Sequence, residues 1–275
     1  RNPPVDDARE QQWRSALAPY YTELGLDIGA IQAGAGRRPF DPETLELIAP
    51  FRPPVVSFHF GLPEAAIIER IKAWGGKVLS TATTMAEGKW LQAHGADAVI
   101  AQGLEAGGHR GQFLSTDLSL QMGTFALLPQ LVAALDIPVI SAGGIADANG
   151  VAAAMALGAA GVQMGTVYLL CPEATTTELH RAALKSEAAQ HTALTNVFSG
   201  GPARGIVNRA IRELGPLSEL APLFPLAGTA MAPLRAANEK TGSGEFSPLW
   251  SGQNNSGCKA ISAFDLTREL AAKIG

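Results

Sequence analysis

The stretch KVLSTATTMAEGKWLQAHGADAVIAQG, residues 77–103, decides the fold class. Its two ends, KVLSTAT (77–83) and AVIAQG (98–103), are short and nearly continuous apolar runs, and the residues between them have a helical pattern. Such runs are typical of parallel strands that are buried on both faces. The stretch therefore predicts a strand–helix–strand unit with a right-handed crossover.

Similar apolar runs occur at other places, each followed by a helical pattern. They are VVSFHFG (55–61), PVISAGGI (138–145) and GVQMGTVYLL (161–170), with a weaker run around 204–207. Repeated strand–helix units close into a barrel or form a doubly wound sheet. Five clear strands and a weak sixth are fewer than the eight of a (β/α)8 barrel. The chain is therefore either an open sheet or begins partway around a barrel.

The two ends of the chain have helical patterns outside these units. One helix is predicted over residues 6–24, and another begins after Asp41, an N-cap residue type that precedes Pro42. Near Leu214 the composition becomes rich in proline and leucine, and two more helices are predicted beyond it, over 230–240 and 262–274. We expect a barrel over residues 1–215 and a C-terminal helical extension over 216–275 that packs on the barrel.

The composition excludes several classes of protein. Apolar types make up 47% of the residues and charged types 17%, which rules out an intrinsically disordered chain. The 21 basic residues are scattered and the net charge is −4, so no nucleic-acid partner is expected. No apolar run approaches the roughly 18–20 residues that span a bilayer, so no membrane partner is expected. The pattern leaves open whether the chain forms a homo-oligomer.

The cysteines and the N-terminus indicate a cytoplasmic protein without a catalytic metal. Cys171 and Cys258 are far apart in the sequence, and no cluster of histidine, aspartate or glutamate has metal-ligand spacing. The N-terminal residues contain no apolar stretch of the kind found in signal peptides. Cys171 is interpreted as a small buried apolar residue.

A glycine-rich loop follows the strand at 98–103 and contains the strongest candidate for catalysis. In AVIAQGLEAGGHRG (98–111), Gln102 ends the strand, and Gly107 and Gly108 precede His109. Function in parallel α/β folds lies in the loops after the carboxyl ends of strands. Glycines let the backbone approach a ligand closely, and a histidine there can act as an acid or a base.

The other histidines lack this setting. His94 and His180 lie in helical patterns and His191 in a polar linker, so a structural role is favoured for them. His59 lies within VVSFHFG and is a weaker candidate for a ligand at the mouth of the barrel.

Two further glycine turns follow neighbouring strands. Gly143 and Gly144 end the strand in PVISAGGIAD (138–147), where Asp147 can cap the next helix. Gly165 and Thr166 end the strand in GVQMGT (161–166). Consecutive backbone N–H groups at such turns bind anions, and two turns in adjacent units are the layout of a barrel phosphate site. The absence of a Walker lysine motif and of G-x-G-x-x-G favours a phosphorylated cofactor or a sugar phosphate.

These phrases resemble a known family when they are taken together and in order. AQGLEAGGH, PVISAGGIAD, GVQMGT, FSGGPARGIVNR (198–209) and LWSGQ (249–253) resemble the nitronate monooxygenases, which are FMN-dependent barrel enzymes. The resemblance extends from about Pro54 to the C-terminus. It favours a (β/α)8 TIM-type barrel that lacks its first strands in this chain, with FMN bound by residues 1–215.

The resemblance implies roles for individual residues. It makes His109 the catalytic base that removes the α-proton of a nitroalkane. It implies that nitronate and O2 are converted into a carbonyl compound and nitrite, as in the detoxification of nitroalkanes. The residues that it implies for FMN binding are Gln102, Gly107, Gly108, Gly143, Gly144, Gln163, Met164, Gly165 and Thr166.

One departure from the family and two rival functions stay open. Family members begin with two strands near the flavin that have no counterpart here, so this chain is expected to start after them. The EAGGH and AGGIAD phrases also resemble the flavin-dependent enoyl-acyl-carrier-protein reductases, and a quinone reductase is a related alternative. LWSGQ favours the monooxygenases. A barrel that binds a phosphorylated ligand without redox chemistry is the second rival.

Overall fold

The chain forms two compact units in a computed structural model that describes residues 3–31 and 38–274. Unit 1 comprises Arg1–Pro39, Gly107–His109 and Ala174–Asn255, and unit 2 comprises Phe40–Ala106, Arg110–Glu173 and Ser256–Gly275. The boundary expected after residue 215 falls within unit 1, and the expected C-terminal extension is divided between both units.

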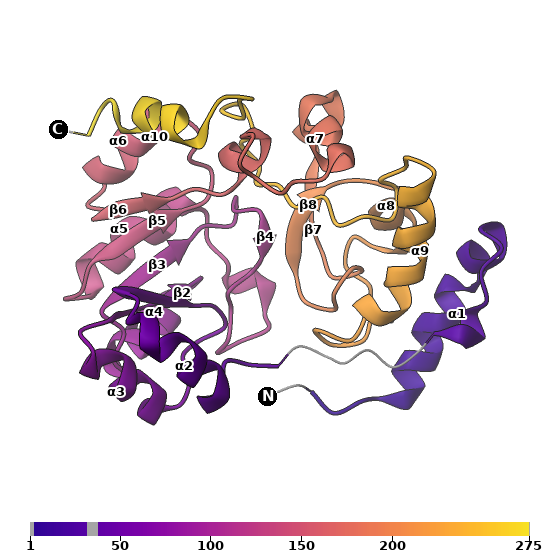
Figure 1. Ribbon diagram of the computed structural model, residues 1–275, viewed down its shortest axis with the longest axis horizontal. Helices are drawn as coiled ribbons and strands as arrows, with labels where there is room; N and C mark the ends of the chain where they lie inside the picture. Colours follow the sequence, from indigo (N-terminus) through magenta and orange to yellow (C-terminus); the bar gives the residue numbers. More distant parts are fainter. Residues whose placement is uncertain (1–2, 32–37, 275) are drawn as a thin grey trace. The chain divides into compact units, whose positions relative to one another are not determined.

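Unit 2 is built on a parallel sheet that curls like half a barrel (Figure 1). The strand order is β1-β2-β3-β5-β6, and the pairing is parallel throughout. The strands are β1 (Val55–Phe58), β2 (Lys77–Ala82), β3 (Ala98–Gln102), β5 (Val139–Ala142) and β6 (Gly161–Gln163). The prediction of five parallel strands alternating with helices is confirmed. The described residues of this sheet do not form the eight strands of a complete barrel.

Helices cover one face of this sheet and bury its largest apolar core. Leu131 of α5 packs against α4 so closely that a Cβ on Gly88 would lie 2.3 Å from its Cδ2 atom. Side chains at N-caps begin four of the helices. Thr84, for example, accepts from the N–H of Glu87, and Asp147 from that of Gly150. The helices of unit 2 are α2 (Pro42–Ile48), α3 (Ala65–Ala73), α4 (Met85–Ala93), α5 (Thr124–Ala134), α6 (Ala148–Ala156) and α10 (Ala263–Ala271), with short 3-10 helices at Ala49–Phe51, Leu118–Leu120 and Thr166–Leu170.

The segment 161–170 is not one long strand as predicted. Its strand ends at Gln163, and Thr166–Leu170 forms the 3-10 helix η4. Gly165, with φ −114° and ψ −60°, leaves the extended conformation and turns the chain into this helix. The apolar residues here face a core instead of a sheet: Val167 of η4 and Cys171, which follows it, are buried beside Leu266 and Leu270 of α10. The interpretation of Cys171 as a buried residue is confirmed.

Unit 1 contains a second, antiparallel sheet of order β4-β8-β7. The weak strand predicted around 204–207 is β8 (Ala203–Ile206), and it pairs with β7 (Thr192–Thr195) and β4 (Gly108–His109). It therefore does not extend the parallel sheet as a sixth strand. The connection from β7 to β8, residues 196–202, is shorter than the dozen or so residues that a parallel crossover requires.

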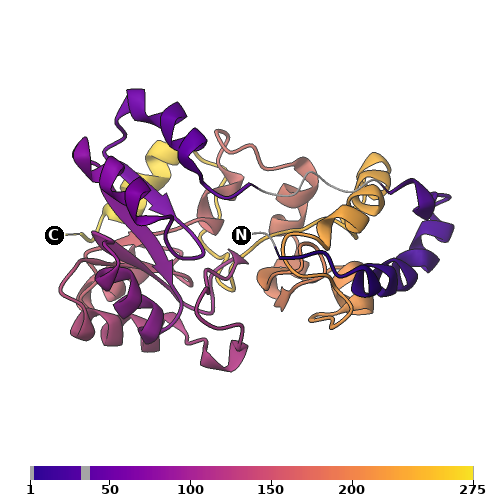
Figure 2. The ribbon, with the colours of Figure 1, turned by 90° about the horizontal axis from the view of Figure 1, so that it is seen from below.

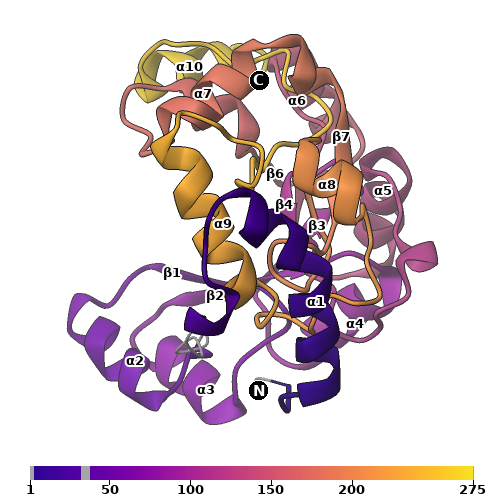
Figure 3. The same cartoon turned by 90° about the vertical axis from the view of Figure 1, so that its right-hand side faces the viewer.

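The helices of unit 1 pack around an aromatic core. The helix α1 (Asp7–Glu23) lies beside α9 (Gly228–Lys240), as Figures 2 and 3 show from two directions. Trp13 is fully buried and its Nε1 donates to the carbonyl of Ala227 at 3.3 Å, while the Tyr21 hydroxyl donates to that of Ala230 at 2.7 Å. The other helices are α7 (Glu178–Lys185) and α8 (Arg209–Leu214), with 3-10 helices at Ile28–Ala30 and Glu187–Gln190.

The helices were also compared with the requirements for crossing a membrane. Within residues 3–31 and 38–274, no helix has both the length and the apolar character needed to cross a bilayer.

Replacing Leu131 by Ala tests the packing of α5 on α4. Leu131 is fully buried, so we expect Leu131→Ala to lower the free energy of unfolding by about 2–5 kcal/mol in chemical denaturation. Phe125 lies on the same helix and is 74% exposed. Phe125→Ala should therefore change the free energy of unfolding by less than about 0.5 kcal/mol. Equal losses in the two variants would contradict this core assignment.

Candidate functional site

Seven of the predicted cofactor-binding residues lie at the carboxyl edge of the parallel sheet in unit 2. The register pairs Gln102 with Ala142 and Ala142 with Gln163, so the three residues form one row across β3, β5 and β6. Paired residues of a parallel sheet point to the same face. The predicted glycine turns follow this row directly, Gly143–Gly144 after β5 and Gly165–Thr166 after β6. These four turn residues, together with Gln102, Gln163 and Met164, are the seven predicted residues in unit 2.

The turn after β5 depends on glycine. Gly143 and Gly144 have φ values of +110° and +74°, in the left-handed region that disfavours side chains. A Cβ on Gly143 would lie 3.0 Å from the backbone nitrogen of Ala106, so this turn is pressed against the loop that follows β3. The Thr124 hydroxyl oxygen lies 2.9 Å from the carbonyl oxygen of Gly143, so the start of α5 packs directly on this turn.

Glu105 ties the same loop to the start of α5. Its carboxylate accepts from the backbone N–H of Thr124 at 2.8 Å and from the Thr124 hydroxyl at 2.9 Å. A carboxylate at a helix N-terminus is stabilised by the unpaired N–H groups there. Glu105 therefore has a structural role in orienting the two loops.

The N-terminus of α6 is occupied by a side chain of the protein. Asp147 is its N-cap, as predicted, and its carboxylate accepts from the N–H of Gly150 at 2.7 Å. The carboxylate of Asp147 therefore already uses one N–H group of the first turn of α6. An anion near the end of β5 would bind to the N–H groups of the glycine turn instead.

The turn after β6 is open at Gly165 and contacted by Cys258, while the neighbouring Gly257 packs on the residues that follow the turn after β5. A Cβ at Gly165 would meet no atom within 4 Å, whereas a Cβ at Gly257 would lie 1.8 Å from the Ala146 carbonyl oxygen. The Cys258 thiol donates to the carbonyl of Thr166 at 3.2 Å. Burial raises the pKa of this thiol to about 11, so it is protonated and can donate at neutral pH. Residues 257 and 258 thus brace both glycine turns.

A buried arginine holds the end of β3. Arg110 is 1% exposed, and its guanidinium donates to the carbonyls of Gln102 at 2.8 Å and Gly103 at 2.7 Å. The Gln102 side-chain oxygen accepts from the N–H of Gly111 at 2.8 Å, which fixes the orientation of that amide. Sequence reasoning missed Arg110, although a charged residue directly after the glycine-rich GGH phrase was a signal for it.

His59 also lies at this edge of the sheet. Its Nδ1 is 3.0 Å from the hydroxyl oxygen of Thr81, which is on β2. Phe60, the next residue, has φ +67°, an uncommon backbone conformation for a side chain of this size. The structure thus places the weaker histidine candidate among polar groups at the carboxyl ends of β1 and β2.

His109 belongs to unit 1, together with Gly107 and Gly108. Its backbone is paired with Ala203 of β8, and its Nε2 lies 2.8 Å from the Ser199 hydroxyl oxygen. The rings of Phe224 and Trp250 meet the imidazole edge to face, with centroids at 5.1 and 5.4 Å. The imidazole is therefore held between one hydroxyl and two aromatic rings.

Gly107 explains why the EAGGH and LWSGQ phrases occur together. A Cβ at Gly107 would lie 2.5 Å from the backbone nitrogen of Gly252 and 2.6 Å from the carbonyl carbon of Ser251. Only glycine lets the two backbones approach this closely. The tail phrase therefore packs on the residues that precede His109.

His180 contacts the backbone of the tail. Its Nε2 lies 3.0 Å from the carbonyl oxygen of Trp250. Burial lowers its pKa, because the imidazolium loses more hydration than the carbonyl hydrogen bond restores. His180 is thus a neutral donor that anchors the backbone of Trp250.

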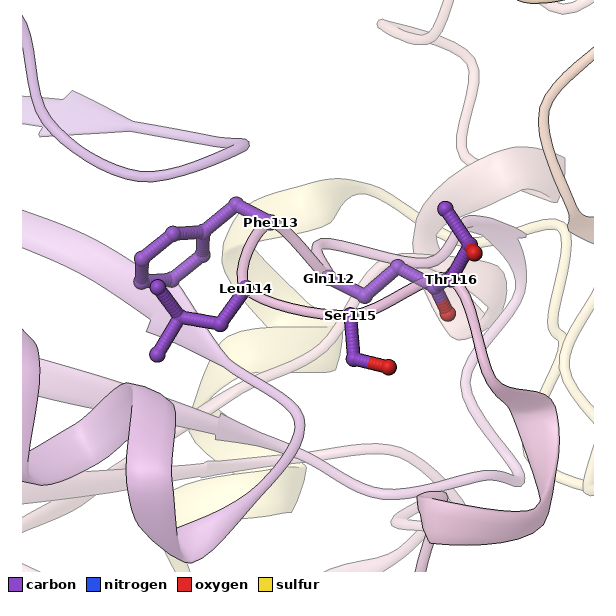
Figure 4. Close-up of a pocket in the computed structure, with 5 residues that line it drawn as sticks. All are labelled: Gln112, Phe113, Leu114, Ser115 and Thr116. Carbon is purple, nitrogen blue, oxygen red and sulfur yellow. The ribbon is translucent and has the colours of Figure 1, made fainter.

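A shallow hollow of about 500 Å³ lies elsewhere in unit 2 and has little chemistry of its own. It is lined by residues 112–116 of a single loop, and Figure 4 shows Phe113 and Leu114 at one end and Thr116 at the other. None of these residues was predicted for the site. In the described part of the chain, no three histidine, cysteine, aspartate or glutamate side chains are grouped to hold a metal ion.

The chain is similar to enzymes that share one name. The sequence model of the family described as nitronate monooxygenase matches residues 3–273. A nitronate monooxygenase of Pseudomonas aeruginosa is 39% identical over 98% of this chain and 78% of its own length. One from Paraburkholderia phytofirmans is 38% identical over 98% of this chain and 74% of its own length.

Solved structures give the same similarity in three dimensions. The nitroalkane oxidase of Streptomyces ansochromogenes has a TM-score of 0.89 and 37% identity, covering 99% of this chain and 78% of its own. FabK of Thermotoga maritima has a TM-score of 0.67 and 28% identity, covering 86% of this chain and 72% of its own.

The packing at Gly107 can be tested with a matched pair of glycine variants. Gly107→Ala would force the Gly252 backbone away, so we expect it to lower the free energy of unfolding by about 1–3 kcal/mol. Gly161→Ala adds a methyl group with no atom within 4 Å and should have little effect. Denaturant titration of both variants measures the difference, and a Gly107→Ala protein as stable as Gly161→Ala would contradict the close approach.

The low pKa of His180 predicts acid sensitivity. Below about pH 6.5 the unfolded chain binds a proton at this imidazole that the folded chain does not, so stability falls as the pH drops. We expect His180→Gln to lose less stability than the wild type between about pH 7 and pH 5.5. His191 is exposed, so His191→Gln is the control and should keep the wild-type slope. Identical slopes in all three proteins would refute this role of His180.

Proposed function

The chain belongs to the nitronate monooxygenase family, and from this premise we propose that it oxidises alkyl nitronates with O2 to carbonyl compounds and nitrite. The relatives are oxidoreductases by name, and the chain is an enzyme of that class. The proposal includes the (β/α)8 barrel, of which five parallel strands with covering helices form a part.

The single observation that carries the proposal is the adjacency of β5 and β6. These strands are hydrogen-bonded neighbours, so the turns Gly143–Gly144 and Gly165–Thr166 leave the same edge of the sheet side by side. Turns of this kind present backbone N–H groups to a phosphate. The left-handed glycines after β5 and the open space at Gly165 fit a phosphate that approaches the backbone.

We propose FMN as the cofactor that these residues hold. FMN, when bound, supplies the electron-transfer chemistry that oxidation of a nitronate by O2 requires. In the proposal, Gly143, Gly144, Gly165 and Thr166 bind the phosphate. Gln102, Gln163 and Met164, at the ends of β3 and β6, contact the remainder of the cofactor. Gly107 and Gly108 complete the set of residues proposed to bind it.

His109 is the proposed catalytic base for neutral nitroalkanes. A base must have a fixed position relative to the carbon–hydrogen bond that it breaks, and the contacts with Ser199, Phe224 and Trp250 supply that fixation. A preformed nitronate has already lost its α-proton and needs no base.

Replacing His109 should affect the turnover of nitroalkanes and of nitronates differently. We expect His109→Ala to retain bound flavin and to oxidise nitronates at a rate near that of the wild type, while its turnover of neutral nitroalkanes falls by about 10²–10⁴-fold. Stopped-flow and steady-state assays with matched nitroalkane and nitronate pairs measure this. His191→Ala, an exposed histidine of the same unit, is the control and should behave as wild type.

The same preparation distinguishes the rival functions. Rapid anaerobic bleaching of the flavin by NADH, with slow reduction by nitronate, would identify a reductase and overturn the proposal. A purified protein that binds no flavin would favour a non-redox phosphate-binding barrel. Equal turnover of nitroalkane by His109→Ala and wild type would remove His109 from the mechanism.

A further inference from the structure

The parallel pairing that aligns β5 with β6 ends before the two glycine turns. The last paired residues are Ala142 and Gln163, whereas the turns lie at residues 143–144 and 165–166. A phosphate that binds to both turns needs donors from each of them within hydrogen-bond distance. The spacing between the turns therefore depends on contacts beyond the end of the paired strands.

Two consecutive residues of the C-terminal segment contact the chain at these turns. Gly257 lies so close to the backbone of Ala146, just after the first turn, that a Cβ here would be 1.8 Å from the Ala146 carbonyl oxygen. The thiol of Cys258 donates to the carbonyl of Thr166, in the second turn, at 3.2 Å. The Cα atoms of neighbouring residues are held about 3.8 Å apart by the planar peptide between them. Gly257 and Cys258 therefore form a bridge of fixed length between the two turns.

The helix α10, which follows this bridge in the sequence, anchors it. Leu266 of α10 is buried in one core cluster with Ala146, which follows the first turn, and with Val167, which follows the second. The hydroxyl oxygens of Tyr168 and Thr267 lie 2.9 Å apart and link the 3-10 helix η4 to α10. The bridge thus continues into a helix that packs on the segments behind both turns, which keeps it from moving freely.

We propose that Gly257 and Cys258 are positioning residues for the cofactor phosphate, because they hold the two glycine turns at the spacing at which both turns reach it. The inference rests on the proposed function, in which these turns bind the phosphate of FMN. Gly257 and Cys258 act on Ala146 and Thr166, and through them on the turns. A shift of one turn by about 1 Å takes its donors outside the range of roughly 2.7–3.2 Å that hydrogen bonds require.

A comparison of two flavins separates this role from general support of the fold. Riboflavin lacks the phosphate of FMN and is otherwise the same molecule. A change in the spacing of the turns should therefore weaken the binding of FMN and leave the binding of riboflavin unchanged. A variant that only loosened the fold would weaken the binding of both flavins alike. The ratio of the two affinities thus reports on the turns themselves.

The test compares Gly257→Ala, Cys258→Ala, Cys258→Ser and Ala260→Ser with the wild type, in the full chain freed of flavin. Alanine at position 257 would force the bridge away from Ala146, and alanine at position 258 removes the donor to Thr166. Serine keeps a donor at position 258. Ala260 is exposed in the same segment, so Ala260→Ser is the matched control. Fluorescence quenching titrations give the affinities for FMN and riboflavin, and circular dichroism shows whether each variant is folded.

We expect the wild type, Cys258→Ser and Ala260→Ser to prefer FMN to the same degree. In Cys258→Ala the ratio of the FMN affinity to the riboflavin affinity should fall roughly 3- to 10-fold, the effect of one hydrogen bond. In Gly257→Ala the ratio should fall further, while the riboflavin affinity stays unchanged.

A wild-type ratio in both Gly257→Ala and Cys258→Ala would overturn the inference, as would an equal loss of affinity for both flavins. If Gly257→Ala does not fold, the difference between Cys258→Ala and Cys258→Ser decides. A wild type that bound both flavins equally would instead overturn the proposed phosphate site itself.

Discussion

The parallel pairing of β3, β5 and β6 is the constraint on which the candidate site in unit 2 depends. Its register places Gln102 and Gln163 in one row and makes the two glycine turns neighbours at one edge of the sheet. No residue of these turns needs a charged side chain, because backbone N–H groups and a threonine hydroxyl are the donors that a phosphate requires. The charged groups nearby, Arg110, Glu105 and Asp147, are engaged with the protein itself and shape the loops.

In unit 1, the candidate residues depend on the close approach of two backbone segments. Gly107 admits the Ser251–Gly252 backbone, and the short β4 strand pairs with β8, so the residues around His109 come from three distant parts of the sequence. His180 anchors Trp250 through its carbonyl, and Trp250 in turn contacts the imidazole of His109. The candidate base is therefore held by packing and by neutral hydrogen bonds.

Local pattern was sufficient to predict much of this architecture. Five strands, the N-caps Asp41 and Asp147, and the glycine turns were readable because each is determined by residues close in sequence. The antiparallel sheet was not predicted, since β4 has two residues and β7 has no strong apolar run. Ser199 is 90 residues from His109, and Arg110 is buried by groups from several loops. A partner as distant in sequence as Ser199 leaves no periodic signal in a single sequence, and the burial of Arg110 depends on how the loops fold back on one another.

The relative affinity of the purified chain for FMN and riboflavin tests the central claim most directly, because the two ligands differ in the phosphate alone. Glycine turns that bind the phosphate should make FMN bind at least about tenfold more tightly than riboflavin, a difference of about 1.4 kcal/mol. Fluorescence quenching titrations of both flavins measure it. Equal affinity for the two flavins, or no binding of either, would contradict a phosphate site at the ends of β5 and β6.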